Sequence, residues 1–432
     1  MSLAKKILYK FRLITTPKII KLSLILHCPW LTARIFQYIA ATVNSQGSYT
    51  VLCLGRTIFT DDVKAMTEHS GQIKYYVIHL RHWQKIYDHF VKQPQRTQIT
   101  ESNYHYCPEG LAPRKKYYRY LQLVLPHLRK FLKINAILSG NFTYVPQIEL
   151  ARVCRQANFP FIVLHKEGLT AGVYKDTHKL YAGQQFIGTR MLVYNQKILE
   201  ALIGKVKNLS LDNIEPVGMP RLDSYFKIKK VKPQKQIIFF SFYPHQRFKR
   251  LVTSQQKFNQ AINRAADFHK WVINFALQNP SYKIIIKTKS AEFYLDYVKH
   301  IFERNFNQPI DNLTITDSGS PPELINQSLV SLGFSSMSLL ESLILNKPII
   351  SPYFGDIVTD KPWDYFGGYR TLINYVKSQS ELHQLLSHPE QLAPINQQQK
   401  NKFLERFIYQ PDGRACQRAE RAIIKTIKLC QA

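Results

Sequence analysis

The chain has 432 residues, 45% hydrophobic and 20% charged, which is the composition of an ordinary globular protein long enough for two or three domains. Its 59 Lys and Arg residues against 29 Asp and Glu residues give a net charge of +30, which predicts polyanionic partners such as nucleotides, nucleic acid or an anionic membrane surface. The six cysteines form no Cys-x-x-Cys pair, so no zinc pattern is present and reduced thiols in the cytosol are expected. No apolar run is long enough to span a bilayer.

Residues 1–45 are predicted to form basic amphipathic helices. Lysines and arginines alternate there with apolar residues, at Lys5, Lys6, Lys10, Arg12, Lys18 and Lys21. Two interpretations stay open: a helix lying on an anionic membrane, or a helix packed on the first domain with its basic face in solvent. The expected location is therefore cytoplasmic, with peripheral attachment to the inner face of the cell membrane as one of these two interpretations.

An α/β domain is predicted over residues 46–228. It opens with two β-rich runs, Tyr49 to Leu54 and Tyr75 to Leu80. Arg56, just past the first run, can meet a ligand, although a solvated loop arginine is the more frequent outcome. The stretch from Arg81 to Lys116 is polar and aromatic, and no element is predicted within it. The helical spacing that follows contains Pro126, which predicts a kink or a break.

A cleaner strand–helix–strand pattern then begins. Ala136 to Ser139 is a buried strand followed by the turn Gly140-Asn141, and Phe161 to Leu164 is the next strand, followed by His165 to Gly168. A right-handed connection places the two turns side by side at the carboxyl ends of neighbouring strands. Two further short strands are predicted, from Met191 to Asn195 and from Ile214 to Gly218.

The first domain ends in Gly218 to Asp223, and residues 229–235 are predicted to be a basic linker. Arg221 and Asp223 are expected to lock this end of the domain by pairing their own charges, rather than to take part in chemistry. They are still expected near a cleft.

The second α/β domain is predicted over residues 236–410, and a final helix over 411–432. Its strands begin with Gln236 to Phe242, and Tyr282 to Lys289 follows after a long helix. Lys287 and Lys289 stand at the end of that second strand. Two successive α/β halves are therefore expected.

Ser328 to Leu332 is a further strand, and Gly333 with Ser335 and Ser336 opens a helix. The first N–H groups of a helix have no internal partner and carry the positive end of its dipole, so this turn predicts a phosphate site. The alternative is that one of the serines only caps the helix.

Four segments in this order resemble bacterial surface-polysaccharide proteins akin to the CDP-glycerol glycerophosphotransferases. They are Leu164 to Gly168, Val217 to Asp223, Gly333 to Pro348 and Asp412 to Arg418. The resemblance implies a GT-B fold, with two facing Rossmann-like domains, a nucleotide-linked donor bound mainly by the second, a last helix crossing back to the first, and no metal or cofactor. Lys289 stands where the family has a histidine.

Roles for individual residues follow from the chemistry and the resemblance. Lys287, Lys289, Ser335 and Ser336 are expected to hold the donor phosphates, and Glu341 the ribose hydroxyls, with a solvent-facing glutamate as the alternative. Glu167 is the predicted acceptor base, tuned by His165 and Lys166, unless it forms only an ion pair with Lys166. His245 is a second base candidate, and Arg247 can reach the pyrophosphate. Gly140 and Asn141 are expected to line the cleft.

The leading hypothesis is a transferase that moves a sugar or alditol phosphate from a nucleotide-linked donor to a surface glycan or lipid-linked acceptor. One alternative is a nucleotide-sugar 2-epimerase on the same fold. A nucleic-acid-binding protein is the alternative from another class, but the sequence contains no recognisable nucleic-acid module.

Overall fold

The computed structural model describes residues 16–44, 46–69, 71–167, 181, 183–290, 292–359, 362–392 and 395–431. The first part of the predicted basic segment and Gly168 lie outside these residues, as does the side chain of Arg247. The chain divides into two compact units. The first comprises Met1–Gly168, Asp176–Asp223 and Phe407–Ala432, and the second comprises Leu169–Lys175 and Ser224–Arg406. Residues 229–235, for which a linker was expected, belong to the second unit.

The first unit is built on a seven-stranded sheet of order β1-β3-β2-β4-β5-β6-β7, parallel except where β1 pairs with β3. Its strands are β1 (Ala41–Thr42), β2 (Tyr49–Gly55), β3 (Ile73–His79), β4 (Ala136–Ser139), β5 (Phe161–His165), β6 (Arg190–Val193) and β7 (Ile214–Pro216). Every position of β4 and β5 is buried, as expected for parallel strands covered on both faces. All the strands predicted here are present, and β1 is an addition.

The strand order of this sheet reverses next to β2. β3 pairs with one edge of β2 and β4 with the other, and β5 to β7 continue outward from β4. The loops that leave β2 and β4 therefore diverge at the carboxyl edge of the sheet. In open α/β sheets this is the place where a crevice forms and ligands bind.

Helices flank this sheet, and they include most of the stretch left unassigned from the sequence. They are a segment over residues 16–25, α2 (Pro29–Ile39), α3 (Thr57–His69), α4 (Leu80–Phe90), α5 (Gln95–Gln98), η1 (Pro108–Gly110), α6 (Leu111–Leu132), α7 (Val145–Gln156), α10 (Gln196–Leu202), η2 (Pro220–Leu222) and α19 (Ala415–Gln431). Pro126 does not break α6. It is exposed, while its neighbours Leu125 and Leu128 are buried and hold the helix to the unit.

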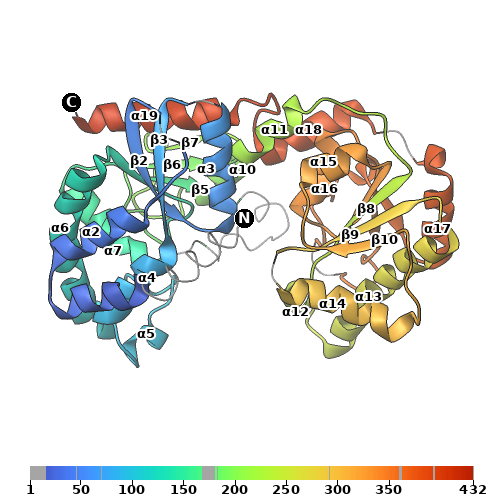
Figure 1. Cartoon of the computed structure of the whole chain (residues 1–432), viewed down its shortest axis with the longest axis horizontal. Helices are drawn as coiled ribbons and strands as arrows, with labels where there is room; N and C mark the ends of the chain where they lie inside the picture. The colour runs from blue at the N-terminus through green and yellow to red at the C-terminus, as the bar shows by residue number, and fades with distance from the viewer. Residues whose placement is uncertain are drawn as a thin grey trace. The chain divides into compact units, whose positions relative to one another are not determined.

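The last helix of the chain belongs to the first unit, as predicted. In Figure 1, α19 lies beside α3, and Tyr75 of β3 donates a hydrogen bond to the Glu420 carboxylate of α19 at 2.9 Å. The N-terminus of α19 is held by Asp223, whose carboxylate accepts hydrogen bonds from the backbone N–H groups of Ala415 (3.0 Å) and Cys416 (2.8 Å). A carboxylate at this position satisfies N–H groups that have no partner within the helix.

The second unit contains a parallel six-stranded sheet of order β10-β9-β8-β11-β12-β13. The strands are β8 (Gln236–Phe240), β9 (Lys283–Lys287), β10 (Leu313–Thr316), β11 (Val330–Gly333), β12 (Ile349–Pro352) and β13 (Asn374–Val376). The helices are α11 (Asp223–Lys227), which begins at the unit boundary, α12 (His245–Leu251), α13 (Gln255–Gln278), α14 (Glu292–Asn305), α15 (Pro321–Gln327), α16 (Met337–Ile344), η3 (Arg370–Leu372), α17 (Gln379–Ser387), η4 (Pro389–Gln391) and α18 (Gln397–Ile408). The order is that of a doubly wound sheet, with its reversal between β8 and β11.

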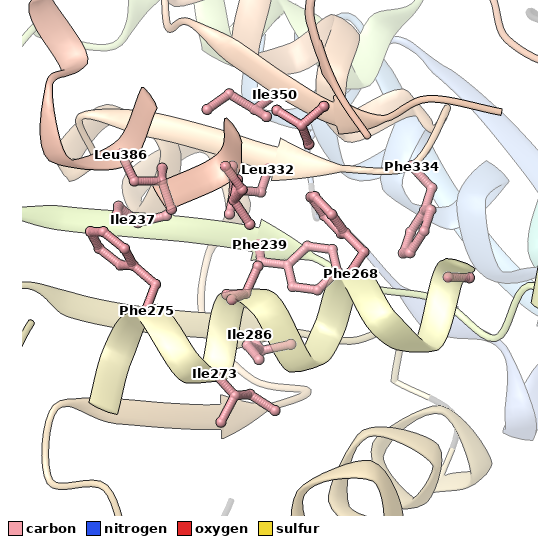
Figure 2. Packing of buried hydrophobic residues seen from close by; sticks show 14 of the residues in the cluster. Ile237, Phe239, Phe268, Ile273, Phe275, Ile286, Leu332, Phe334, Ile350 and Leu386 are labelled. Atoms are coloured by element: carbon pink, nitrogen blue, oxygen red, sulfur yellow. The ribbon is translucent and has the colours of Figure 1, made fainter. Parts of the chain in front are cut away.

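The core of the second unit lies between this sheet and α13. Phe268 and Phe275 of α13 are completely buried against Ile237 and Phe239 of β8, and Leu332 of β11 completes the contact (Figure 2). Phe239 and Phe268 pack edge to face, with ring centroids 5.2 Å apart. The packing holds β8 and β11 in place, and the loops at their carboxyl ends carry most of the predicted donor-binding residues.

Candidate functional site

The serine-rich turn lies at the switch point of the second sheet, directly after β11. An added Cβ on Gly333 would come within 3.0 Å of Leu339 Cδ2 and 3.4 Å of the Phe240 carbonyl oxygen. A side chain at this position would be tightly packed against α16 and β8, and a glycine avoids that contact. Ser335 is buried, and its Oγ accepts a hydrogen bond from the Tyr365 N–H at 3.2 Å, so it fixes the loop after β12.

Ser336 is the N-cap residue of α16, but its side chain makes no capping hydrogen bond. Its Oγ is buried and has no hydrogen-bond partner among the described residues. The expectation that a serine here only caps the helix is therefore wrong for Ser336. An unsatisfied hydroxyl at the positive end of a helix is suited to an anion that can accept its proton.

Glu341 lies one turn into α16 and is half-buried. Its carboxylate accepts a hydrogen bond from Tyr225 Oη of α11 at 2.8 Å. The alternative of a glutamate facing only solvent therefore does not describe this residue. A ligand hydroxyl that binds here would share the carboxylate with Tyr225 or displace it.

The two lysines after β9 differ in their surroundings. Lys287 is half-buried, and its Nζ donates to the Asp317 carbonyl oxygen at 2.8 Å. Burial lowers the pKa of this ammonium group, and the Asp317 charge opposes the shift. Lys289 instead lies over two rings, with its Nζ 5.9 Å from the centroid of Phe242 and 5.6 Å from that of Tyr294.

The loop after β8 is held by a buried contact. Ser241 Oγ lies 2.7 Å from His269 Nε2, and burial lowers the pKa of His269 to about 4, so the imidazole is neutral near pH 7. Beyond this loop, His245 begins α12, with its ring parallel to that of Tyr243 at 5.7 Å. His245 therefore lies in the segment that follows β8, whereas the Arg247 side chain is not described.

In the first unit, the two predicted turns do lie side by side. β4 and β5 pair in parallel, and the Lys166 N–H donates to the Gly140 carbonyl oxygen at 3.0 Å. An added Cβ on Gly140 would meet the Phe59 side chain at 2.7 Å, and Asn141 Oδ1 accepts from the Thr143 N–H at 3.1 Å. Gly140 and Asn141 thus shape the carboxyl edge of the sheet.

Glu167 forms an ion pair with Lys166, with 2.7 Å between Nζ and Oε1. Burial raises the pKa of the Glu167 carboxyl, but the charge and hydrogen bond of Lys166 outweigh it, so the pKa lies below its usual value. A lower pKa makes a weaker base. His165 next to it is completely buried, and burial lowers its pKa to about 4. The ion pair with Lys166, which was the alternative to a base role for Glu167, is therefore present. The role of Glu167 as the acceptor base stays a prediction.

The expected pairing between Arg221 and Asp223 is wrong. Arg221 Nη1 instead lies 3.1 Å from the Asp62 carboxylate of α3 and 2.7 Å from Tyr194 Oη, and Tyr194 also donates to Asp62. Asp62 and Tyr194 are completely buried, and Asp223 caps α19. Both residues therefore tie distant parts of the first unit together, and the residues they contact were not identified from the sequence.

A further cluster missed in the sequence lies in the loop after β12. Asp364 is buried, forms an ion pair with Arg370 at 3.1 Å and accepts a hydrogen bond from Tyr375 Oη. The same loop donates to Ser335 through the Tyr365 N–H. The run of aromatic residues around Asp364 was its only signal in the sequence. In the described part of the chain no group of three His, Cys, Asp or Glu side chains is placed to hold a metal ion.

No model of a known protein family matches the chain, and no curated protein matches it in sequence. Its fold is similar to those of solved structures. A putative UDP-N-acetylglucosamine 2-epimerase from Listeria monocytogenes has a TM-score of 0.50 at 9% sequence identity, over 89% of this chain and 97% of that one. The wall teichoic acid polymerase TagF has a TM-score of 0.49 at 12% identity, over 98% and 99%. MnaA from S. aureus, solved with UDP, has a TM-score of 0.48 at 11% identity, over 89% and 98%.

Identities this low concern the fold alone. Together with the two strand orders, the similarity to the Listeria structure defines a GT-B type of fold, in which each of two Rossmann-like domains contains a parallel sheet. The predicted fold class is confirmed.

Proposed function

We propose that the protein is a transferase that uses a nucleotide-linked donor and delivers a sugar or alditol phosphate to a cell-surface polysaccharide or lipid-linked acceptor. The observation that carries this proposal is the buried Ser336 hydroxyl at the N-terminus of α16, at the switch point of the second sheet, which has no hydrogen-bond partner among the described residues. Phosphate groups bind readily at such helix ends, because the backbone N–H groups and the dipole favour negative charge. The TagF polymerase, which has the same type of fold, supports a place in surface-polymer synthesis.

The donor is assigned to the second unit. Lys287 lies at the end of β9 and Ser336 follows β11, and both strands pair with β8. Adjacent strands are about 4.8 Å apart, so the two strand ends are separated by about 10 Å and lie on the same edge of the sheet. In this proposal Lys287, Ser335 and Ser336 serve the phosphates and Glu341 the ribose. Lys289, Arg247 and His245 are further candidates on the same side of the sheet.

The acceptor is assigned to the first unit, with Glu167 as the proposed base. Its ion pair with Lys166 would have to open or weaken for Glu167 to take a proton. Gly140 and Asn141 are proposed to shape the acceptor site. We further propose that the reaction needs no metal or cofactor and that the protein acts in the cytoplasm.

The decisive experiment separates transfer from epimerisation. The purified chain would be titrated with CDP, UDP and GDP by calorimetry, and the best base then tested as its sugar and alditol conjugates. A transferase releases the nucleotide only when an acceptor is present, whereas a 2-epimerase changes the sugar configuration without one. Binding of no nucleotide would contradict the proposal, and epimer formation without an acceptor would establish the alternative.

Replacing Glu341 with glutamine is expected to weaken donor binding more than it lowers turnover at saturation. A ribose contact far from the reacting bond contributes equally to the ground and transition states. The change would be read from KM and kcat with the identified donor. Tyr225→Phe is the matched control, since it removes the hydrogen-bond donor but leaves the carboxylate. A loss confined to kcat in Glu341→Gln would instead place this carboxylate at the chemistry.

Association with an anionic membrane is proposed for the N-terminal segment. Among the described residues, the helical segment 16–25 and the turn after it leave large apolar side chains in solvent, with Lys18 and Lys21 exposed beside them. These side chains are Ile19, Leu22, Ile25 and Leu26, at 44%, 51%, 59% and 60% exposure. Apolar and basic side chains on one exposed surface are typical of interfacial helices. No described helix has the length and apolarity to cross a membrane.

The double substitution Ile25→Ser with Leu26→Ser is therefore expected to lower binding to anionic vesicles at least tenfold. Burying one such side chain is worth about 1.5–3 kcal/mol, and about 1.4 kcal/mol corresponds to a factor of ten. Co-sedimentation with phosphatidylglycerol vesicles measures the effect. Leu123→Ser and Leu211→Ser, at exposed leucines elsewhere in the first unit, are the controls. Equal binding by the wild type and the double variant would contradict the membrane role.

A further inference from the structure

The first unit contains one cavity of about 440 Å³ and another of about 470 Å³. The cavity of about 470 Å³ lies at the carboxyl edge of the sheet. Arg56 follows β2, His79 ends β3, and Tyr144 lies in the loop after β4. These residues line the cavity together with Arg81 and Tyr87 of α4. The cavity therefore lies at the switch point of this sheet, where an open α/β sheet offers a ligand site.

The lining of this cavity is strongly basic. Arg56 and Arg81 form no ion pair with any carboxylate among the described residues, while Arg96 is paired with Asp88 at 3.3 Å. The Arg56 guanidinium is placed over the Tyr144 ring, 4.5 Å from its centroid. Glu101 is the one acidic residue in the lining, and its carboxylate accepts a hydrogen bond from Thr143 Oγ1 at 2.8 Å. Within the described part of the chain, the cavity thus has an excess of positive charge that no carboxylate neutralises.

Two buried hydroxyl groups in the lining also lack a hydrogen-bond partner among the residues that the structure describes. Tyr87 is 1% exposed and Tyr144 is 5% exposed, and neither Oη makes a hydrogen bond within the described part of the chain. Leaving a buried hydroxyl unsatisfied costs free energy, so such groups in a cavity indicate a ligand that accepts their protons. Arginine cations and tyrosine donors together favour an anionic ligand rich in acceptor oxygens.

The imidazole of His79 adds a further donor. Its Nδ1 accepts a hydrogen bond from the Arg81 N–H at 3.1 Å, which leaves the proton of the neutral ring on Nε2. Burial lowers the pKa of His79, and the charges of Arg81 and Arg56 lower it further. An anion bound between these arginines would reverse their effect on His79.

We infer that this cavity binds a phosphoryl group carried on a small polar molecule, such as a sugar phosphate or polyol phosphate. Arginine side chains match the oxygen geometry of phosphate, and three phosphoryl oxygens can use the guanidinium and hydroxyl donors at once. The volume exceeds that of the ion alone and lies in the range of small-molecule sites, so the body of the ligand also fits. That this ligand is the acceptor rests on the proposed function; the binding itself does not.

The test uses the full chain and two probes that carry the same group. Glycerol 3-phosphate is titrated by calorimetry as the soluble source, and phosphatidylcholine vesicles with and without phosphatidic acid represent a lipid source. Arg56→Gln and Arg81→Gln are each expected to weaken binding of the phosphate probe about tenfold to a hundredfold, the effect of one charge-assisted hydrogen bond. Arg155→Gln, which removes an exposed arginine of α7 outside the cavity, is expected to leave binding unchanged.

Tyr87→Phe provides a variant that tests the site rather than the fold. Because the Tyr87 hydroxyl has no partner in the described structure, its removal is expected to leave the thermal unfolding midpoint unchanged or higher while it weakens phosphate binding. If the arginine variants lost binding of either probe and kept their binding of nucleoside diphosphate, this would support a phosphate site in the cavity. That conclusion would hold whatever the outcome for the donor site in the second unit. Retained binding of both probes in Arg56→Gln and Arg81→Gln would overturn the inference.

Discussion

Arg221→Ala is expected to lower the free energy of unfolding by about 3 kcal/mol. The substitution leaves Asp62, which is completely buried, without its cationic partner. Removing one partner of a buried ion pair costs about 3–5 kcal/mol, because the remaining charge stays buried and uncompensated. The lower end of this range applies, since the backbone N–H of residue 221 (3.1 Å) and Tyr194 Oη still donate to the Asp62 carboxylate. Urea denaturation measures the change.

Arg190→Ala is the matched control for this prediction. Arg190 of β6 forms an ion pair with Glu215 of the neighbouring strand β7 at 2.9 Å, but the Glu215 side chain is 36% exposed. Pairs that solvent can screen contribute about 0–1 kcal/mol, so the control variant should lose little stability. If Arg221→Ala lost no more stability than Arg190→Ala, the contact with Asp62 would have no part in holding the first unit together.

The strands of both sheets could be predicted because parallel strands read as continuous apolar runs. Ala136–Ser139 is buried at every position and was predicted with the same bounds that the structure has. The short strands β1 and β13 were missed, since two or three residues carry no pattern. The serine-rich turn could be found because it has a local pattern: a glycine and three serines stand within a few residues between two apolar runs.

The stretch from Arg81 to Lys116 could not be assigned, although it forms part of the wall of the basic cavity. The buried residues of α4 include Leu80, Trp83, Ile86 and Tyr87, which have helical spacing. The histidine, arginine and glutamine residues between them obscured this periodicity. Arg56 was noted as an arginine that can meet a ligand, with a solvated loop arginine as the more frequent outcome, but the residues that line the cavity with it were not identified.

Contacts between residues far apart in the sequence could not be predicted, for a physical reason. Arg221 meets Asp62 across 159 positions, and Asp223 meets Ala415 across 192. A single sequence shows that a charge is present but not which distant group compensates it. The local pairing of Arg221 with Asp223 was inferred from proximity in the chain, and the fold instead gives each residue its own partner.

Lys287→Ala is expected to weaken binding of the matching nucleoside diphosphate about tenfold to a hundredfold and to cost more than Lys289→Ala. A charge-assisted hydrogen bond to phosphate contributes about 1.5–3 kcal/mol. Lys287 is expected to matter more because it directly follows the apolar run of β9 at the carboxyl edge of the sheet. A bound phosphate would compete for its Nζ with the Asp317 carbonyl oxygen, which accepts a hydrogen bond from it at 2.8 Å. Lys289 lies over the Phe242 and Tyr294 rings. Calorimetric titration of the two variants measures the difference.

The effect should also depend on pH. Binding of phosphate requires the charged ammonium group, and burial lowers the pKa of Lys287, so its contribution to affinity should fall at a lower pH than that of an ordinary lysine. Lys283→Ala is the matched control, since Lys283 is exposed at the amino end of the same strand. If Lys287 only closes the loop onto Asp317, Lys287→Ala would lower the unfolding midpoint and leave nucleotide affinity unchanged, which would remove this lysine from the site. A larger loss of affinity in Lys289→Ala would assign the phosphate to Lys289 instead.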